Sequence, residues 1–258
     1  MTQESISIDA VTKRFPLKGS SEGVLALENV SLSVGQSEFV ALLGPSGCGK
    51  STLLRLIASL EDPSEGSVTV NDNEPRAMAT RHALGVAFQD HALLPWLSVQ
   101  DNIALPFSLA NRRTDKQAID QLIDLVGLKG FETARPGQLS GGMRQRVSIA
   151  RSLVLSPEVL LLDEPFGALD AVTRRQMNIE LQRIWSQQKI TTVLVTHSVD
   201  EALFLADRIL VLSARPGRII REVVVPFERP RHPSVMRSEE FHTLVDDLTE
   251  ALHPSEAA

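Results

Sequence analysis

The strongest constraint on this chain is a glycine-rich run, Gly44-Pro45-Ser46-Gly47-Cys48-Gly49-Lys50-Ser51-Thr52, which matches the pattern G-x-x-x-x-G-K-[ST]. A continuous apolar run, Phe39 to Leu43, precedes it and suits a strand covered on both faces. Apolar residues with helical spacing follow it, over residues 51–59. The alternative is a glycine-rich turn that caps a helix and binds nothing, but the strand before the run and the helix after it favour a phosphate-binding loop.

This loop predicts a nucleoside triphosphate as the ligand. Its glycines allow backbone N–H groups to curl around phosphate oxygens, and the helix that follows presents its positive N-terminal end to the same anion. Lys50 is expected to reach the β- and γ-phosphates, and the Ser51 hydroxyl is expected to bind Mg²⁺.

The rest of the chain predicts an α/β fold with a largely parallel sheet, because strands and helices alternate along it. Strands are expected over residues 5–11, 24–34, 39–43, 67–70, 84–88, 159–163, 191–196, 209–212 and 218–225, and residues 17–23 are expected to form a turn. Helices are expected over residues 51–59, 112–126, 141–155, 172–188 and 238–252. We expect residues 6–225 to form one nucleotide-binding domain, with a helical insertion over about 90–155 and a tail over 226–258.

Composition narrows the class of protein. A formal net charge of −6 argues against a nucleic-acid partner, because such proteins usually present a basic face. Cys48 is the one cysteine, so no intrachain disulfide is possible, which fits a reducing compartment. The first ten residues lack the pattern of a secretory signal, and no apolar run approaches the ~20 residues that span a bilayer. We therefore expect a soluble chain that reaches a membrane only through a partner.

Two acidic residues, Asp163 and Glu164, follow the aliphatic run at residues 159–162. An acid at the end of such a strand can hold Mg²⁺ through water, which is the role expected for Asp163. Glu164 projects differently and is expected to polarise the attacking water, a contribution of ~10² to 10⁴ in rate. The alternative is an acidic helix N-cap after a core strand, which is weaker in a chain that also carries a phosphate loop.

Residues 139–146, with the letters LSGGMRQR, resemble the signature motif of ATP-binding cassette (ABC) transporters. The likeness also includes Gln89 after an apolar strand, residues 168–170 just past the two acids, and His197 at the end of a later strand. It extends from about Ile6 to Val225 and implies an ABC cassette with an antiparallel N-terminal β layer and an inserted helical subdomain. The chain departs from the commonest form of the signature at Met143, a position where glutamine is the usual residue.

The resemblance implies roles for single residues around ATP and Mg²⁺. Gln89 would touch the metal or the attacking water and sense a permease. Ser140, Gly141 and Gly142 would bind the γ-phosphate of ATP held by a second copy, since they open a helix. Asp170 would lie at the seam between the two copies.

Two assignments have structural alternatives. His197 would contact the γ-phosphate, and the alternative is a lone surface or core histidine. The chain has no tyrosine, so Phe15 is the candidate to stack on adenine, and the alternative is a core phenylalanine.

Four segments, at residues 89–96, 99–106, 166–174 and 213–219, resemble the nitrate/sulfonate/taurine subfamily of importers. That likeness implies import of a small anion, or in some members of a pyrimidine precursor. It also implies a homodimer on the cytoplasmic face of the membrane, with two permease subunits and a solute-binding protein outside the cell. Trp96 would face the permease, and the alternative is a buried core position.

Other classes of protein built on the same nucleotide-binding fold are less consistent with this sequence. A chromosome-maintenance or repair ATPase needs a long coiled coil between loop and signature, and no sustained heptads lie there. A translation factor of the cassette family would carry tandem cassettes. A scaffold that does not hydrolyse nucleotide would not need both Glu164 and His197.

Overall fold

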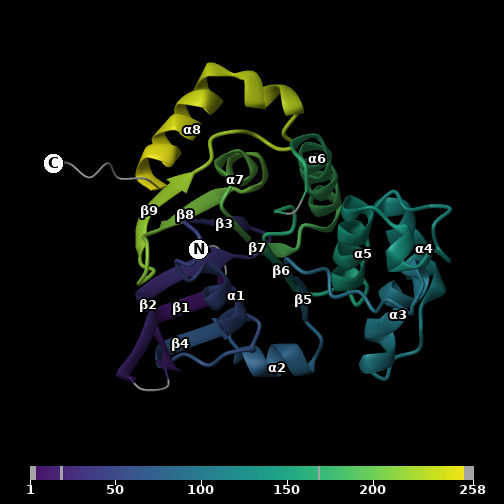
Figure 1. Ribbon diagram of the computed structural model, residues 1–258, viewed down its shortest axis with the longest axis horizontal. Coiled ribbons are helices and arrows are strands. Elements are labelled where there is room, and N and C mark those ends of the chain that lie inside the picture. The colour runs from purple at the N-terminus through teal and green to yellow at the C-terminus, as the bar shows by residue number, and fades with distance from the viewer. Residues whose placement is uncertain (1–3, 18–19, 168, 253–258) are drawn as a thin grey trace.

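The larger of two β-sheets has six strands in the order β5-β6-β7-β3-β8-β9 (Figure 1). The computed structural model describes residues 4–17, 20–167 and 169–252. The strands are β3 (Phe39–Leu43), β5 (Leu84–Ala87), β6 (Val159–Asp163), β7 (Thr191–Thr196), β8 (Arg208–Leu212) and β9 (Ile219–Val224). All neighbouring pairs are parallel except β8 and β9. The predicted, mainly parallel core sheet is therefore confirmed.

The smaller sheet is antiparallel and lies at the N-terminal end of the chain, as predicted. Its order is β2-β1-β4, with β1 at Glu4–Leu17, β2 at Ser20–Gly35 and β4 at Glu65–Val70. The turn expected over residues 17–23 is shorter than predicted, because β1 and β2 stay paired to the end of a long hairpin, where Leu17 is opposite Ser20. Residues 18 and 19 of that turn lie outside the described part of the chain.

The central strand β3 is buried on both faces, and its side chains alternate between two hydrophobic cores. Phe39, Ala41 and Leu43 belong to one core, and Val40 and Leu42 belong to the other. This is why the run reads as continuously apolar rather than alternating, as is usual for a strand that is covered on both sides.

Helices cover both faces of the larger sheet (Figure 1). Helix α1 (Lys50–Ile57) packs between the two sheets, and the short α2 (Pro75–Thr80) lies against β4. The opposite face carries α6 (Ala171–Gln188) and α7 (Val199–Leu205). The strand and helix alternation thus produces the layered arrangement that the sequence predicts.

Residues between β5 and β6 form a group of helices beside the β5 edge of the sheet (Figure 1). They are α3 (Val99–Leu109), α4 (Lys116–Leu125), the 3-10 turn η1 (Pro136–Gln138) and α5 (Gly141–Leu153). The helix expected at residue 112 begins later, because Asp115 caps it by accepting a hydrogen bond from the Ala118 N–H at 3.0 Å. Helix α3 was not predicted as a separate element, since Pro106 lies inside it.

The tail, for which the sequence predicts a helix over residues 238–252, docks on the sheet. After the 3-10 turn η2 (Pro233–Arg237), α8 (Glu239–Leu252) lies over α7, β8 and β9 (Figure 1). Its own side chains Phe241 and Leu248 are buried on the face that meets these elements. Residues 253–258 lie outside the described part. Among the helices described, none combines the length and apolar composition needed to cross a bilayer.

Candidate active site

The phosphate loop joins β3 to α1, and its backbone requires glycine. Gly49 has a φ of +109°, and a Cβ there would lie 2.7 Å from Leu27 Cδ2 and 2.8 Å from the carbonyl oxygen of Ala26. Both the left-handed backbone and the close approach of β2 therefore exclude a side chain. The glycine pattern thus holds the loop in the tight curl from which α1 starts.

The Lys50 side chain lies inside that curl. It is only 4% exposed, and its Nζ donates hydrogen bonds to the carbonyl oxygens of Gly44 at 2.6 Å and of Pro45 at 2.9 Å. The ammonium group is thus fixed next to the backbone amides of the loop. An anion bound by those amides would meet a positive charge that is already in place.

Ser51 and Asp163 are joined directly, although they are far apart in the sequence. The Ser51 hydroxyl donates to Asp163 Oδ1 at 2.8 Å. Asp163 ends β6, and β6, β7 and β3 run parallel, so their carboxyl ends meet at one edge of the sheet. Burial raises the pKa of Asp163, and the hydrogen bond from Ser51 partly offsets this.

This pair fits Mg²⁺, which prefers oxygen ligands and keeps several waters. Among the described residues, no cluster of three or more histidine, cysteine, aspartate or glutamate side chains could hold a metal. A magnesium ion beside Ser51 and Asp163 would take its other ligands from phosphate, from water and from Gln89, the side chain predicted to touch the metal.

Glu164 and His197 face each other across the same edge. His197 Nδ1 lies 3.2 Å from Glu164 Oε2. The Glu164 backbone is left-handed, with a φ of +43°, which costs a residue other than glycine ~1 kcal/mol. Its N–H donates to the carbonyl oxygen of Val195 at 2.9 Å, which holds this turn against β7. The two predicted catalytic side chains therefore come together.

A cavity of about 400 Å³ is lined by the phosphate loop and by Glu164, whereas Asp163 and His197 are not among its lining residues. The predicted residues that line it are Phe15, Ser46, Gly47, Gly49, Lys50, Ser51, Thr52, Gln89 and Glu164. Cys48 is buried in the core instead, and Gly44 and Pro45 contribute the carbonyl oxygens that hold Lys50. The structure thus gathers the loop, the glutamine and the second acid around one space.

Phe15 lies on β1 at the wall of this cavity and is only partly buried. The alternative of a core phenylalanine is therefore wrong. The ammonium group of Lys13 lies 4.9 Å from the centre of the Phe15 ring. A cation in this position is attracted to the face of the ring, which helps to hold the Phe15 side chain in place.

Arg215 also lines the cavity, although the sequence analysis did not select it. Its Nε donates to the carbonyl oxygen of Gly47 at 3.4 Å. The signal was available, because Arg215 follows β8, a parallel neighbour of β3, and the carboxyl ends of these strands share an edge.

The signature residues lie elsewhere. Ser140 is exposed and caps α5 by accepting a hydrogen bond from the Met143 N–H at 3.3 Å. Neither it nor Gly141 or Gly142 lines the cavity. Within one chain, the signature and the phosphate loop therefore do not form a common pocket.

Asp170 caps α6, next to the start of α5. It accepts hydrogen bonds from the N–H groups of Val172 at 3.1 Å and Thr173 at 3.0 Å. The hydrogen bonds from Thr173 lower the pKa of Asp170. A Cβ on Gly142 would lie 3.0 Å from Thr173 Cγ2, so the two helix starts are in close contact. Ala168, which precedes this turn, lies outside the described residues.

A further buried acid, Glu201, lies behind the Glu164–His197 pair and was not singled out from the sequence. It is 4% exposed, and the Thr196 hydroxyl donates to its Oε2. Burial is the main reason that the pKa of Glu201 rises to about 7. Its position in α7, close after His197, was the only signal for it in the sequence.

Together, this geometry defines a phosphate-loop nucleotidase with its site at the carboxyl edge of a mainly parallel sheet. A family model described as ABC transporter matches residues 27–167. The chain belongs to that family, and it is an ATP-hydrolysing cassette that serves transport.

Comparisons with individual proteins agree with this family. The chain is 46% identical to the aliphatic sulfonates import ATP-binding protein SsuB of Bacillus subtilis, over 88% of each chain. It is 46% identical to the nitrate import ATP-binding protein NrtD of Synechococcus elongatus, over 88% of this chain and 83% of that one. It also resembles a dimeric, post-hydrolysis structure of the ATP-binding cassette MJ0796 bound to ADP and Pi, with a TM-score of 0.75 and 30% identity over 86% of this chain and all of that one.

Proposed function

We propose that this chain is the ATPase subunit of an importer for a small anion such as taurine, an aliphatic sulfonate or nitrate. The names of its relatives carry the choice of solute, since they are import proteins for aliphatic sulfonates and for nitrate. A pyrimidine precursor is the second candidate solute. The names also favour transport over the chromosome-maintenance and translation alternatives.

The observation that carries the hydrolytic function is the meeting of the phosphate loop, the Ser51–Asp163 pair and the Glu164–His197 pair at one sheet edge. The loop amides and Lys50 would hold the β- and γ-phosphates. Mg²⁺, bound near Ser51, Asp163 and Gln89, would neutralise phosphate charge. Glu164 would accept a proton from the attacking water, and His197 would orient Glu164 and contact the γ-phosphate.

We further propose that two copies complete each other's sites. The signature residues Ser140 and Gly142 are at the start of α5, outside their own cavity, where their backbone amides could meet the γ-phosphate of ATP held by a second copy. Asp170, in contact range of this helix start through Thr173, would lie at the seam. The dimeric state of the similar MJ0796 cassette supports this arrangement. ATP would close the pair and hydrolysis would release it, a shift between two states.

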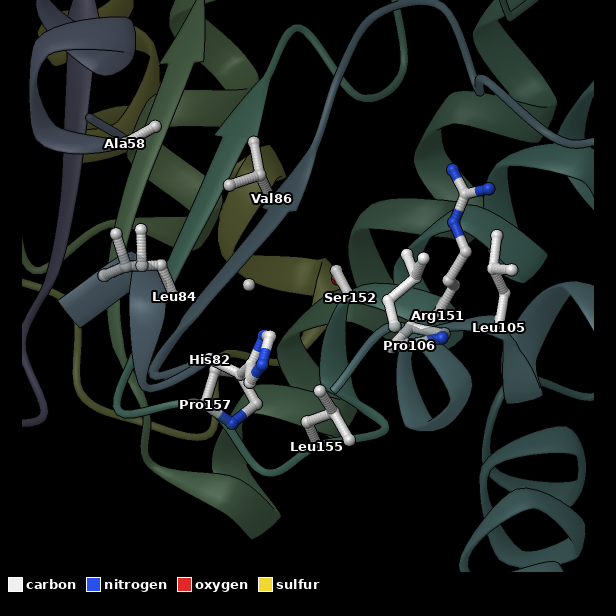
Figure 2. A pocket seen from close by; sticks show the side chains of 13 residues that line it. Ala58, His82, Leu84, Val86, Leu105, Pro106, Arg151, Ser152, Leu155 and Pro157 are labelled. Carbon is white, nitrogen blue, oxygen red and sulfur yellow. The ribbon is translucent and has the colours of Figure 1, made fainter. Parts of the chain in front are cut away.

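The permease contact is proposed at a groove beside the β5 edge of the large sheet. The groove has a volume of about 350 Å³, and Figure 2 shows Leu84 and Val86 on one side of it and Leu105, Pro106 and Arg151 on the other. It therefore lies between the core sheet and the helical subdomain. An apolar groove of this kind suits a helix from the cytoplasmic side of a permease. Attachment there would place the chain peripherally on the membrane.

Trp96, also expected to face the permease, is 65% exposed, so the alternative of a core position is wrong. A large exposed apolar side chain is typical of a surface that a partner covers. Together with Gln89, which lines the nucleotide cavity, it would link nucleotide state to the permease.

Leu109→Glu is expected to weaken attachment to the permease roughly tenfold or more, because it puts a charge on an apolar contact. Leu109 lines the groove and is 70% exposed, so ATP hydrolysis by the isolated chain should stay within about twofold of the parent. The fraction of tagged chain recovered with membranes measures the effect. Val224→Glu is the matched control, since Val224 is equally exposed but lies on β9. Equal recovery of both variants would place the permease elsewhere.

Phe15→Ala is expected to weaken ATP binding about 5- to 100-fold, the equivalent of ~1–3 kcal/mol for a stacked base. Calorimetric titration with ATP measures it, with Phe131→Ala, a partly exposed phenylalanine outside the cavity, as the control. Unchanged affinity in a folded Phe15→Ala variant would show that adenine does not stack there.

A deletion strain tests the proposed solute. Growth should fail with taurine or an alkanesulfonate as the sole sulfur source, or with nitrate as the sole nitrogen source, and the parent gene should restore it. Restoration should fail with a Lys50→Ala gene, because transport needs hydrolysis. Normal growth on all of these sources, together with loss of pyrimidine-precursor uptake, would instead favour the second candidate.

A further inference from the structure

A ring of hydrogen bonds closes around the backbone of His197. On one side, the Thr196 hydroxyl donates to Glu201 Oε2 and accepts from the Ser198 N–H at 3.0 Å. On the other side, the Ser198 hydroxyl accepts from the Glu201 N–H at 3.4 Å. Thr196 is therefore tied to the buried Glu201 side chain, and Ser198 is tied to Thr196 and to the backbone of the first turn of α7.

The other catalytic segment is held from the same place. Arg174 donates from Nε to the carbonyl oxygen of Phe166 at 3.2 Å, and from Nη2 to those of Gly167 at 3.3 Å and Leu169 at 3.0 Å. These carbonyls belong to the segment that leads from Glu164 to the α6 cap. The Arg174 guanidinium is near enough to Glu201 to act on its carboxyl electrostatically, and so is Glu164.

We propose that Glu201 is a positioning residue for hydrolysis, which acts through Thr196 to hold the His197 backbone and so keeps Nδ1 of His197 on the Glu164 carboxylate. This inference rests on the roles of Glu164 and His197 proposed above. In this role Glu201 fixes the group that orients Glu164.

A role in stability alone explains this acid poorly. Among the described residues, Glu201 Oε1 is buried without a hydrogen-bond partner. A buried polar atom in that state costs free energy, and an apolar side chain of similar size would avoid the cost. What an apolar residue cannot provide is the acceptor for Thr196. The hydrogen bond to Thr196, rather than the burial, is therefore the useful feature of the site.

Two matched pairs of variants test the proposal. Glu201→Ala removes the acceptor, whereas Glu201→Gln keeps a neutral acceptor of the same length. Thr196→Val removes the hydroxyl, whereas Thr196→Ser keeps it. Steady-state ATP hydrolysis should show kcat lower by about 10- to 100-fold for the alanine and valine variants, since a displacement of ~1 Å can cost that much. KM for ATP should change by less than about threefold, and the glutamine and serine variants should recover most of kcat.

Gln182→Ala controls for stability. Gln182 is buried in α6 and hydrogen-bonds the backbone of Arg231 at 2.7 Å and 2.9 Å, on the tail rather than at the site. Its Tm should fall while kcat stays within about twofold. Glu201→Ala and Gln182→Ala are compared at a similar fall in Tm. If Glu201→Ala then lowers kcat no more than Gln182→Ala does, the proposal is overturned. Failure of both Glu201→Gln and Thr196→Ser to recover activity would also overturn it.

A double variant distinguishes this inference from the proposed function. Because Glu201 acts through its hydrogen bond with Thr196, Glu201→Ala with Thr196→Val should lower kcat no further than Thr196→Val alone, which also removes the acceptor of the Ser198 N–H. If the losses of kcat in the two single variants were additive in the double variant, Glu201 would not act through Thr196. If Glu164→Gln itself left hydrolysis unchanged, the proposed roles of Glu164 and His197 would fail first. If Glu164→Gln abolished turnover while Glu201→Ala had no effect, only the inference about Glu201 would fail.

Discussion

Glu164→Gln is expected to reduce ATP turnover by about 10²- to 10⁴-fold and to leave ATP binding intact. Glutamine has the same shape but cannot accept a proton from the attacking water. The left-handed turn at Glu164 and the bond from its N–H to Val195 do not involve the side chain, so the local backbone should survive the change. His197 Nδ1 can still meet an oxygen at that position, which keeps the rest of the site in place.

The same variant should also accumulate a dimer. If ATP closes two copies and hydrolysis releases them, a chain that binds but cannot hydrolyse will remain paired. Light scattering after size exclusion, with ATP and Mg²⁺ and then with ADP, measures this. Glu65→Gln is the control, because Glu65 is exposed on β4 and does not line the nucleotide cavity. Hydrolysis at the parent rate would show that Glu164 is not the base. A monomer under all nucleotide conditions, even with the permease present, would contradict the two-copy mechanism.

The features of the site that could be predicted from the sequence are those formed by short local motifs. The phosphate loop and the acids after β6 are each set by adjacent residues, so their spacing is visible in one dimension. The contact between Ser51 and Asp163 also follows from sequence, because Ser51 begins the helix after β3 and Asp163 ends β6, and the carboxyl ends of these parallel strands share one edge of the sheet.

Long-range packing explains what the sequence did not predict. Helix α3 escaped detection because its sequence carries Pro106 and no clear apolar stripe, and its helical form depends on packing against α5. The docked position of α8 depends on Phe241 and Leu248 meeting a surface built from distant segments. Neither contact leaves a local pattern.

Two site residues were missed for a related reason. Arg215 lies in the segment at residues 213–219 that resembles importers, but its contact with the site depends on a partner that the fold brings to it, and the same is true of Glu201. Arg215 meets Gly47 across the sheet edge, and Glu201 acquires its buried environment from the elements around α7. Burial of an acid can be read from a structure but not from the letters beside it.

Lys50→Ala is expected to lower ATP affinity by about 30-fold or more, because hydrogen bonds from a charged group in a buried site contribute ~2–3 kcal/mol or more. The ammonium of Lys50 is also the donor to the carbonyl oxygens of Gly44 and Pro45, so the variant loses a restraint on the loop as well as a charge. These two effects can be separated by comparing ligands. Lys50 is expected to contact the β- and γ-phosphates, so affinity for ATP should fall much more than affinity for AMP.

Calorimetric titration of both nucleotides, with Lys116→Ala as an exposed control on α4, measures the difference. Phe15→Ala should weaken both nucleotides alike, since adenine is common to them, and this gives the opposite pattern to Lys50→Ala. An equal loss for ATP and AMP in Lys50→Ala would mean that the lysine serves only to shape the loop. Unchanged ATP affinity would refute the phosphate-loop assignment, because no other cation in the loop could replace a charge held inside its curl.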